Sequence, residues 1–231
     1  MTAERALLTL LQFADGLFPT GGFAHSFGLE TYVQDGRVRD RHGLEAFVAA
    51  HLEGSAGPAD AAAVALAVRL SAQAEADDWI ALDQRLEAMK PVPEFRAASR
   101  QMGRQTLRIA VGLGDDPFLA RLAGAVDHEQ ACGHHASVFG AVVGRGGVAP
   151  RAAAAAHLYS TAELLVGAGL RLIALGQLEG QRVLAAMRDR IERLAAAAEA
   201  AKTADDLWSF NPAIEIAGIR HATLDSRLFR S

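Results

Sequence analysis

The chain has 231 residues, of which 51% are hydrophobic, so it is long enough for one large domain with a substantial core. Its formal net charge of −4 argues against a general nucleic-acid binder, which would carry an excess of Lys and Arg. The single cysteine, Cys132, excludes an internal disulfide and fits a reducing compartment, so we expect a cytoplasmic protein.

Neither a membrane span nor a signal peptide is predicted. Stretches free of Asp, Glu, Lys and Arg, such as residues 16–29 and 131–144, are shorter than the roughly 20 apolar residues that a helix needs to cross a bilayer. The N-terminus lacks a basic segment followed by an apolar run and a cleavage site.

Along the chain, helical periodicity dominates and strand alternation is hard to find. Four prolines stand where a helix can begin, three of them directly after a Gly, Asp or Asn: Pro58, Pro117, Pro150 and Pro212. A single-domain, all-α helical bundle of about nine or ten helices is therefore expected for residues 1–231.

The helix that begins at Pro150 is predicted to be central and buried. Large and small residues alternate there at spacings of four and three: Leu158, Ala162, Leu165, Gly169, Leu172 and Gly176. The small residues would let another helix approach closely. A break or bend is expected at Gly180-Gln181, before another helix over residues 183–201.

The first candidate for chemistry is a glycine-rich segment that ends in His25 and Ser26. A Gly-Gly pair before a helix can present backbone N–H groups to an anion, but the Gly-Lys-Ser/Thr ending of a phosphate loop is absent. Adjacent helical residues point about 100° apart, so His25 cannot readily act as a base for Ser26. We favour a shaped turn over a hydrolytic triad and expect no enzyme activity.

The second candidate is a group of possible metal ligands, namely His128, Cys132, His134 and His135. His128 and Cys132 are four residues apart and could share a helical face, whereas two adjacent histidines face different sides. This spacing is poor for a metal site. Packed or solvent-facing histidines are favoured, and no metal or cofactor is predicted.

The third candidate is a stripe of arginines, Arg96, Arg100, Arg104 and Arg108, spaced four apart on one helical face. The stripe could bind an acidic partner or a phosphate. It could equally be a solvated face with acidic neighbours in the same chain, and the sequence leaves both possibilities open.

Two further features suggest binding. Residues 220–231 place Leu224, Leu228 and Phe229 among three arginines, which is the composition of a docking tail. A tail packed on its own core is the alternative. Arg171 interrupts an apolar segment, so we expect it to pair with an acidic residue or to emerge at a subunit boundary.

Five blocks of sequence, in order across nearly the whole chain, resemble the UreF family of urease accessory proteins. They are residues 10–15 with Phe18-Pro19-Thr20-Gly21-Gly22-Phe23-Ala24-His25-Ser26 and Gly28-Leu29-Glu30, then Ser99-Arg100-Gln101-Met102-Gly103-Arg104, then His134-His135-Ala136-Ser137-Val138-Phe139-Gly140, then Leu175-Gly176-Gln177 with Gly180-Gln181, and finally the tail from Arg220-His221 to Ser231. Phe27, Ala222 and Asp225 depart from the residues that are common in the family.

The resemblance implies an all-α homodimer with a role in nickel delivery to urease rather than in urea hydrolysis. It implies that the protein is a scaffold and regulator that binds a UreD-type accessory protein (UreH in some naming). Together the two would recruit the GTPase UreG to apo-urease for nickel insertion.

The residues expected to bind partners lie in the tail: Arg220, His221, Leu224, Ser226, Arg227, Leu228, Phe229 and Arg230. Further possible interface residues are found in the other matching blocks, together with Arg171: Thr20, Gly21, Gly22, His25, Ser26, Glu30, Arg100, Arg104, His134, His135 and Gln177. Two alternatives stay open. One is a helical metal-binding protein or direct nickel chaperone that uses His128, Cys132, His134 and His135. The other is a helical module that binds an acidic protein through the arginine stripe.

Overall fold

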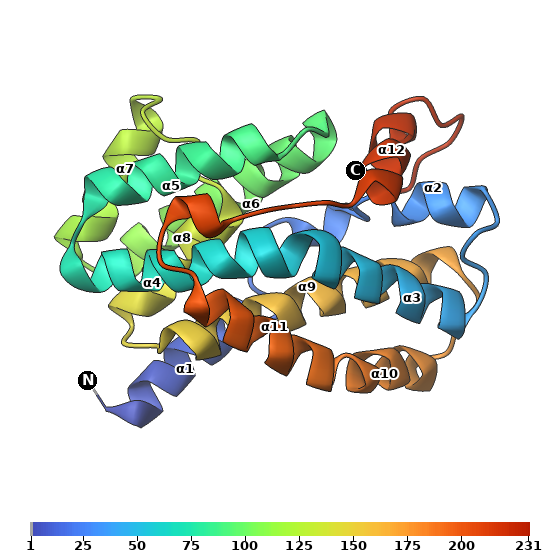
Figure 1. The fold of residues 1–231 in the computed structure, drawn as a ribbon, viewed down its shortest axis with the longest axis horizontal. Coiled ribbons are helices and arrows are strands. Elements are labelled where there is room, and N and C mark those ends of the chain that lie inside the picture. Colours follow the sequence, from blue (N-terminus) through green and yellow to red (C-terminus); the bar gives the residue numbers. More distant parts are fainter. Residues whose placement is uncertain (1) are drawn as a thin grey trace.

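The computed structural model describes residues 2–231, and within that range all regular secondary structure is helical (Figure 1). The α-helices are α1 (Ala3–Ala14), α2 (Leu29–Gln34), α3 (Arg41–His51), α4 (Ala62–Gln73), α5 (Ala76–Met89), α6 (Pro93–Leu113), α7 (Pro117–Asp127), α8 (His135–Arg145), α9 (Pro150–Leu172), α10 (Gln177–Ala186), α11 (Arg188–Ala200) and α12 (Pro212–His221). Two short 3-10 helices, η1 (Gly22–Ala24) and η3 (Ala204–Asp206), and a π-helical segment, η2 (Leu52–Ala61), complete the fold. The predicted all-α class is confirmed. The twelve α-helices of residues 2–231 are close to the expected nine or ten, because α3, η2 and α4 follow one another without a break and form one continuous helical segment.

The centre of the bundle is formed by α4, α8 and α9, and α4 packs against both of the others. The close approach of α4 and α8 depends on Gly140, since a Cβ atom there would lie 2.5 Å from the carbonyl oxygen of Val64. On the next layer, Trp79 of α5 is fully buried, and its indole nitrogen donates a hydrogen bond of 2.9 Å to the carbonyl of Ser137. Small residues therefore set the spacing of the central helices.

Three of the four predicted proline starts are confirmed, at Pro117, Pro150 and Pro212. Asp116 caps α7, with its carboxylate accepting from the backbone N–H groups of the next turn. The predicted start at Pro58 is wrong, because this residue lies inside η2 in a continuous helical run from α3 to α4. The wider π-helical turn accommodates a residue that has no backbone donor.

The predicted burial of α9 is confirmed at Leu158, Ala162, Leu165 and Gly169. The prediction is wrong for Gly176, which was expected in the same buried helix. The helix α9 ends at Leu172, and Gly176 is exposed and forms the N-cap of α10.

The predicted break at Gly180-Gln181 is also wrong, since Gly180 lies inside α10 and its missing side chain lets α10 approach α9. The chain instead bends at Met187, between α10 and α11. As a result, the helix predicted for residues 183–201 is split in two.

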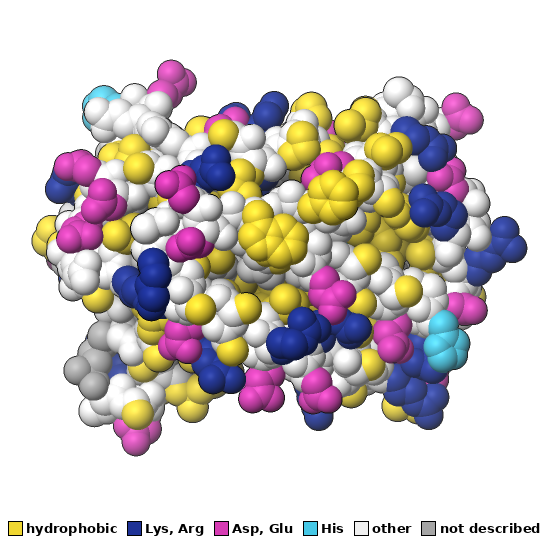
Figure 2. Space-filling view, viewed as in Figure 1, with side chains coloured by type: hydrophobic (Ala, Val, Ile, Leu, Met, Phe, Trp, Pro, Cys, Tyr) yellow, Lys and Arg dark blue, Asp and Glu magenta, His cyan; other side chains and the backbone are white. Residues whose placement is uncertain are grey.

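One broad face of the molecule carries charged side chains of both signs, with hydrophobic side chains exposed near its middle (Figure 2). The segment between η3 and α12 crosses this face (Figure 1), and there Trp208 and Phe210 are 55% and 75% exposed. None of the helices in residues 2–231 combines the length and apolar character required to span a bilayer.

Candidate functional site

The last residues of the chain fold back onto the segment around η1, so the first and last matching blocks of sequence form one site. The backbone N–H of Arg230 donates to the carbonyl of Ala24 at 2.8 Å. The backbone N–H and the hydroxyl of Ser26 both donate to the carbonyl of Ser231, at 2.6 and 2.8 Å. His25 is 3% exposed, and its Nδ1 lies 2.8 Å from the hydroxyl of Ser231. The Ser26 hydroxyl is thus directed to the tail rather than to His25.

Glu30 holds this arrangement together from α2. It is 2% exposed, and its carboxylate accepts from the backbone N–H groups of Leu228 and Phe229 at 2.6 and 3.1 Å. The ring of the fully buried His221 lies between two carboxylates, 2.9 Å from Glu30 and 2.7 Å from Glu94. A buried carboxylate requires such partners, because burying an unpaired charge is costly.

A second set of contacts fixes the start of the tail to the outer side of α2. Arg220 makes a two-pronged ion pair with Asp35, with N···O distances of 2.7 and 3.0 Å. The hydrogen bond and the positive charge of Arg220 lower the pKa of Asp35. Gln34 donates a hydrogen bond of 2.9 Å to the carbonyl of Ser226. The tail is therefore held along its length.

These contacts divide the tail residues that were expected to bind partners into buried residues and exposed ones. Phe229 is only 4% exposed and belongs to the hydrophobic core, and His221 is fully buried, so neither offers a free side chain to a partner. Leu224 is half-buried, whereas Ser226, Arg227, Leu228 and Arg230 are exposed. The expected role of Phe229 as a partner anchor differs from its position here, where it anchors the tail itself. Partner binding by the exposed residues stays a prediction.

Arg171 joins the tail to η1. Its guanidinium carbon lies 3.7 Å from the ring centre of Phe23 and 4.4 Å from that of Phe229. Its Nε donates to the carbonyl of Gly167 at 3.1 Å, and within residues 2–231 it makes no ion pair with an acidic side chain. Partial burial lowers the pKa of Arg171. Two aromatic rings thus contact the guanidinium where one of the two sequence alternatives expected an acidic partner. The other alternative, a position at a subunit boundary, stays a prediction. We call the residues Phe23, Arg171, Leu228 and Arg230 the tail surface.

A cavity of about 1020 Å³ extends inward from this region. Several expected interface residues line it: Thr20, Gly21, Gly22, His135, Arg171 and Gln177. Gly21 has a left-handed backbone with φ of 86°, and the backbone N–H of Gly22 donates to the Thr20 hydroxyl at 3.1 Å. The glycine-rich segment is therefore a shaped turn at the edge of the cavity.

Three histidines line the inner part of the cavity. The rings of His135 and His157 are 5.3 Å apart, and His51 also faces the cavity, near an ion pair of 2.7 Å between Lys90 and Asp60. One ring nitrogen of each histidine has no hydrogen-bond partner among the described residues. Burial lowers the pKa of His51 and His157 to about 4 and that of His135 to about 3. These rings are neutral at pH 7.

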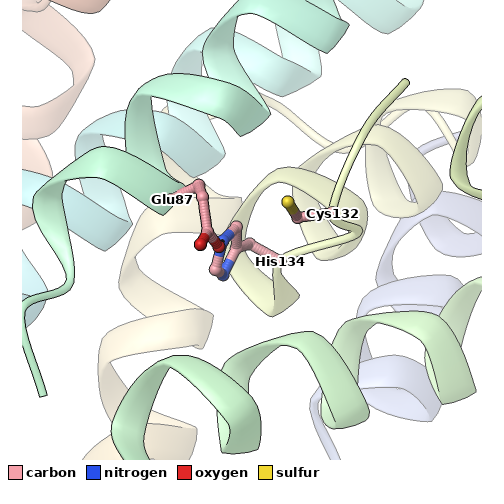
Figure 3. A group of neighbouring side chains, drawn as sticks. All are labelled: Glu87, Cys132 and His134. Atoms are coloured by element: carbon pink, nitrogen blue, oxygen red, sulfur yellow. The ribbon is translucent and has the colours of Figure 1, made fainter. Parts of the chain in front are cut away.

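The candidate metal ligands separate in the structure. His135 faces the cavity, and His128 ends α7 with its Nδ1 2.7 Å from the carbonyl of Gly124. Cys132 and His134 come together, and Glu87 of α5 joins them (Figure 3). Sequence spacing missed Glu87, because it lies 45 residues before Cys132 and reaches the group only through the packing of α5.

Most of the arginine stripe is engaged within the chain. Arg100 forms a two-pronged hydrogen-bonded pair with Glu87, and Arg96 lies 3.4 Å from the same carboxylate. Arg104 donates to the carbonyl of Cys132 at 2.9 Å, and Arg108 to the side chain of Gln105. The intramolecular interpretation expected acidic neighbours, and two of the four arginines, Arg96 and Arg100, share one in Glu87. Arg104 instead holds the loop before α8.

Comparison with known proteins identifies the wider family. The model of the UreF family matches residues 38–188. Proteins named urease accessory protein UreF are similar over nearly the whole chain. One from Bacillus sp. is 31% identical, covering 97% of this chain and 99% of the relative. One from Dechloromonas aromatica is 36% identical, covering 97% of each. One from Rhizobium leguminosarum bv. trifolii is 35% identical, covering all of both chains.

Proposed function

The chain belongs to the UreF family of urease accessory proteins, and from that premise we propose that it serves urease maturation as a non-catalytic scaffold. In this proposal it binds a UreD-type accessory protein as a homodimer. Together the two proteins recruit the GTPase UreG to apo-urease, where nickel is inserted.

The tail surface is the observation that carries this proposal. Phe23 and Leu228 are 76% and 64% exposed, although both are large apolar residues. Arg171 lies directly beside Phe23, and apolar anchors next to arginine are typical of the residues that contribute most binding energy at interfaces. Because Glu30 and the buried Phe229 hold the tail in place, little conformational entropy would be lost when a partner docks.

The test is co-purification of the full chain with the UreD-type protein, followed by addition of UreG. Phe23→Ala and Leu228→Ala each remove an exposed side chain and should leave the fold intact. Each is expected to weaken the complex by about 2 kcal/mol, or roughly thirtyfold in Kd, which is typical of truncating a hot-spot residue. Leu113→Ala is the matched control, since Leu113 is 60% exposed at the end of α6.

Loss of the UreD-type protein from both variants, but not from the control, would support the proposal. UreG should then fail to join the assembly. Binding of both variants at full strength would overturn the assignment of the tail surface.

A further inference from the structure

We propose that Glu87, Cys132 and His134 form a binding site for a borderline divalent transition-metal ion, of the class of Zn²⁺ or Ni²⁺. One carboxylate oxygen, one thiol sulfur and one imidazole nitrogen lie within 4.8 Å of one another. Figure 3 shows the Glu87 carboxylate against the ring of His134, with the Cys132 sulfur on the loop beside them. This donor set suits borderline ions rather than Mg²⁺ or Ca²⁺, which prefer oxygen ligands.

The spacing is close to what a tetrahedral ion requires. Ligand atoms about 2.0–2.3 Å from such an ion lie roughly 3.3–3.6 Å from each other. Nε2 of His134 is 2.9 Å from Oε2 of Glu87, which is slightly shorter than this ligand-to-ligand distance. No two of the three ligand atoms are more than 4.8 Å apart. Small rotations of the Glu87 and Cys132 side chains would bring all three donors to one ion, and a water molecule could supply the fourth ligand.

The imidazole is positioned by a residue outside the ligand set. Nδ1 of His134 lies 3.0 Å from the hydroxyl of Ser99 on α6, so Nε2 is directed at Glu87. Metal-binding histidines commonly have their second nitrogen held in this way, which fixes the ring orientation. His134 is fully buried, so its ring has little freedom to turn elsewhere.

The loop that carries Cys132 and His134 is held rigidly. Asp83 is fully buried, and its carboxylate accepts from the backbone N–H groups of Cys132, Gly133 and His134 at 2.6, 2.9 and 2.7 Å. A Cβ atom at Gly103 would lie 2.2 Å from the carbonyl of Gly133, so α6 packs directly on the loop. The backbone of the two loop ligands is therefore preorganised before any ion binds.

Charge and exposure set how strongly the ion would bind. Arg96 and Arg100 already contact Glu87, and their positive charges oppose a cation, which predicts reversible rather than tight binding. Binding would release the proton of the Cys132 thiol, whereas the Nε2 proton of His134 would move to Nδ1, where the Ser99 hydroxyl can accept it. Cys132 and Glu87 are each partly exposed, so the ion can enter from solvent.

The experiment uses the purified full chain, reduced and freed of metal with a chelator. Titration with Co²⁺ should produce a thiolate-to-cobalt charge-transfer absorption in the near ultraviolet, with a stoichiometry of one ion per chain. Zn²⁺ and Ni²⁺ added afterwards should abolish or shift this absorption, and their relative potency shows which of the two ions the site prefers.

Three variants make the test specific. Cys132→Ser should remove the charge-transfer absorption completely, and Ser99→Ala should weaken binding by about tenfold, because the imidazole loses its positioning partner. His128→Ala is the control, since His128 is an exposed histidine outside the group and should leave the titration unchanged. Circular dichroism of each variant would separate loss of the site from loss of the fold.

Absence of the charge-transfer absorption in the wild-type chain, or a Co²⁺ affinity of a folded Ser99→Ala variant equal to that of the wild type, would overturn the proposal. The readout needs no partner protein, so this result is independent of the co-purification test of the tail surface.

Discussion

Glu30 is only 2% exposed, and its carboxylate accepts hydrogen bonds from two tail backbone N–H groups. The same carboxylate lies 2.9 Å from Nε2 of His221. Hydrogen bonds to a charged group contribute about 1.5–3 kcal/mol each when buried partners would otherwise be left unsatisfied. The position of the tail therefore depends on this one carboxylate more than on the exposed Arg220–Asp35 ion pair, which is screened by solvent.

We predict that Glu30→Gln lowers the free energy of unfolding by about 2 kcal/mol and exposes the tail to proteolysis. The amide keeps the shape of the side chain, but its NH₂ group cannot accept the hydrogen bonds that the second carboxylate oxygen accepts. Urea denaturation and limited proteolysis provide the two measurements. Glu192→Gln is the control, because the Glu192 side chain is 75% exposed. Equal stability and equal cleavage of the two variants would show that the tail is held by other contacts.

At the scale of the element, α9 contains two glycines with opposite surroundings. At Gly169, a Cβ atom would lie 2.6 Å from the side chain of the fully buried Leu44. At Gly167, on the same helix, a Cβ atom would meet nothing within 4 Å. The first glycine lets α3 and α9 approach, whereas the second only adds flexibility to the unfolded chain.

Thermal and urea melts of two variants would separate these roles. Gly169→Leu should lower the free energy of unfolding by about 1–3 kcal/mol or more, because the core is already filled there. Gly167→Ala should instead raise it by roughly 0.5–1 kcal/mol, since alanine favours the helix. An unchanged melting temperature for Gly169→Leu would contradict the observed packing of Leu44 on α9.

For the molecule as a whole, the buried histidines determine how stability depends on pH. Burial lowers the pKa of His51 and His157 to about 4, and that of His135 to about 3, from an ordinary value of 6.5. Burial, followed by the charge of Arg230, lowers that of His25 to about 4. In the unfolded chain each ring takes up a proton below about pH 6.5, whereas in the folded chain it does not.

The free energy of unfolding should therefore be constant above about pH 6.5 and fall as the pH drops toward 4. At pH 5 the loss should be roughly 2 kcal/mol for each of these histidines. Urea denaturation between pH 7.5 and pH 5 gives the slope. The slope of the unfolding free energy against pH should become shallower in His157→Gln, because one histidine fewer takes up a proton on unfolding. His42 is exposed, so His42→Gln should leave the slope unchanged. A slope that is the same in all three proteins would show that His157 is protonated in the folded state.

The sequence alone determined the fold class and the family, because both depend on local or ordered patterns. Helical periodicity and the prolines at Pro117, Pro150 and Pro212 act within a few residues, so they predicted the helices there correctly. Five blocks in order were enough to indicate the UreF family, which the comparisons then confirmed. The local signals failed at Pro58, which lies inside a π-helical segment, and at Gly180, where packing against α9 outweighed them.

Only the tertiary structure decided which side chains meet. Glu30 and Leu228 are 198 residues apart, and Glu87 and His134 are 47 residues apart. No periodicity of 3.6 residues connects such pairs, since their contacts follow from how whole helices pack. The same packing buries Phe229 and leaves Leu228 exposed, although the two residues are adjacent and both are apolar. The composition of the tail suggested a docking segment, but the direction of each side chain depends on the surface against which the tail folds.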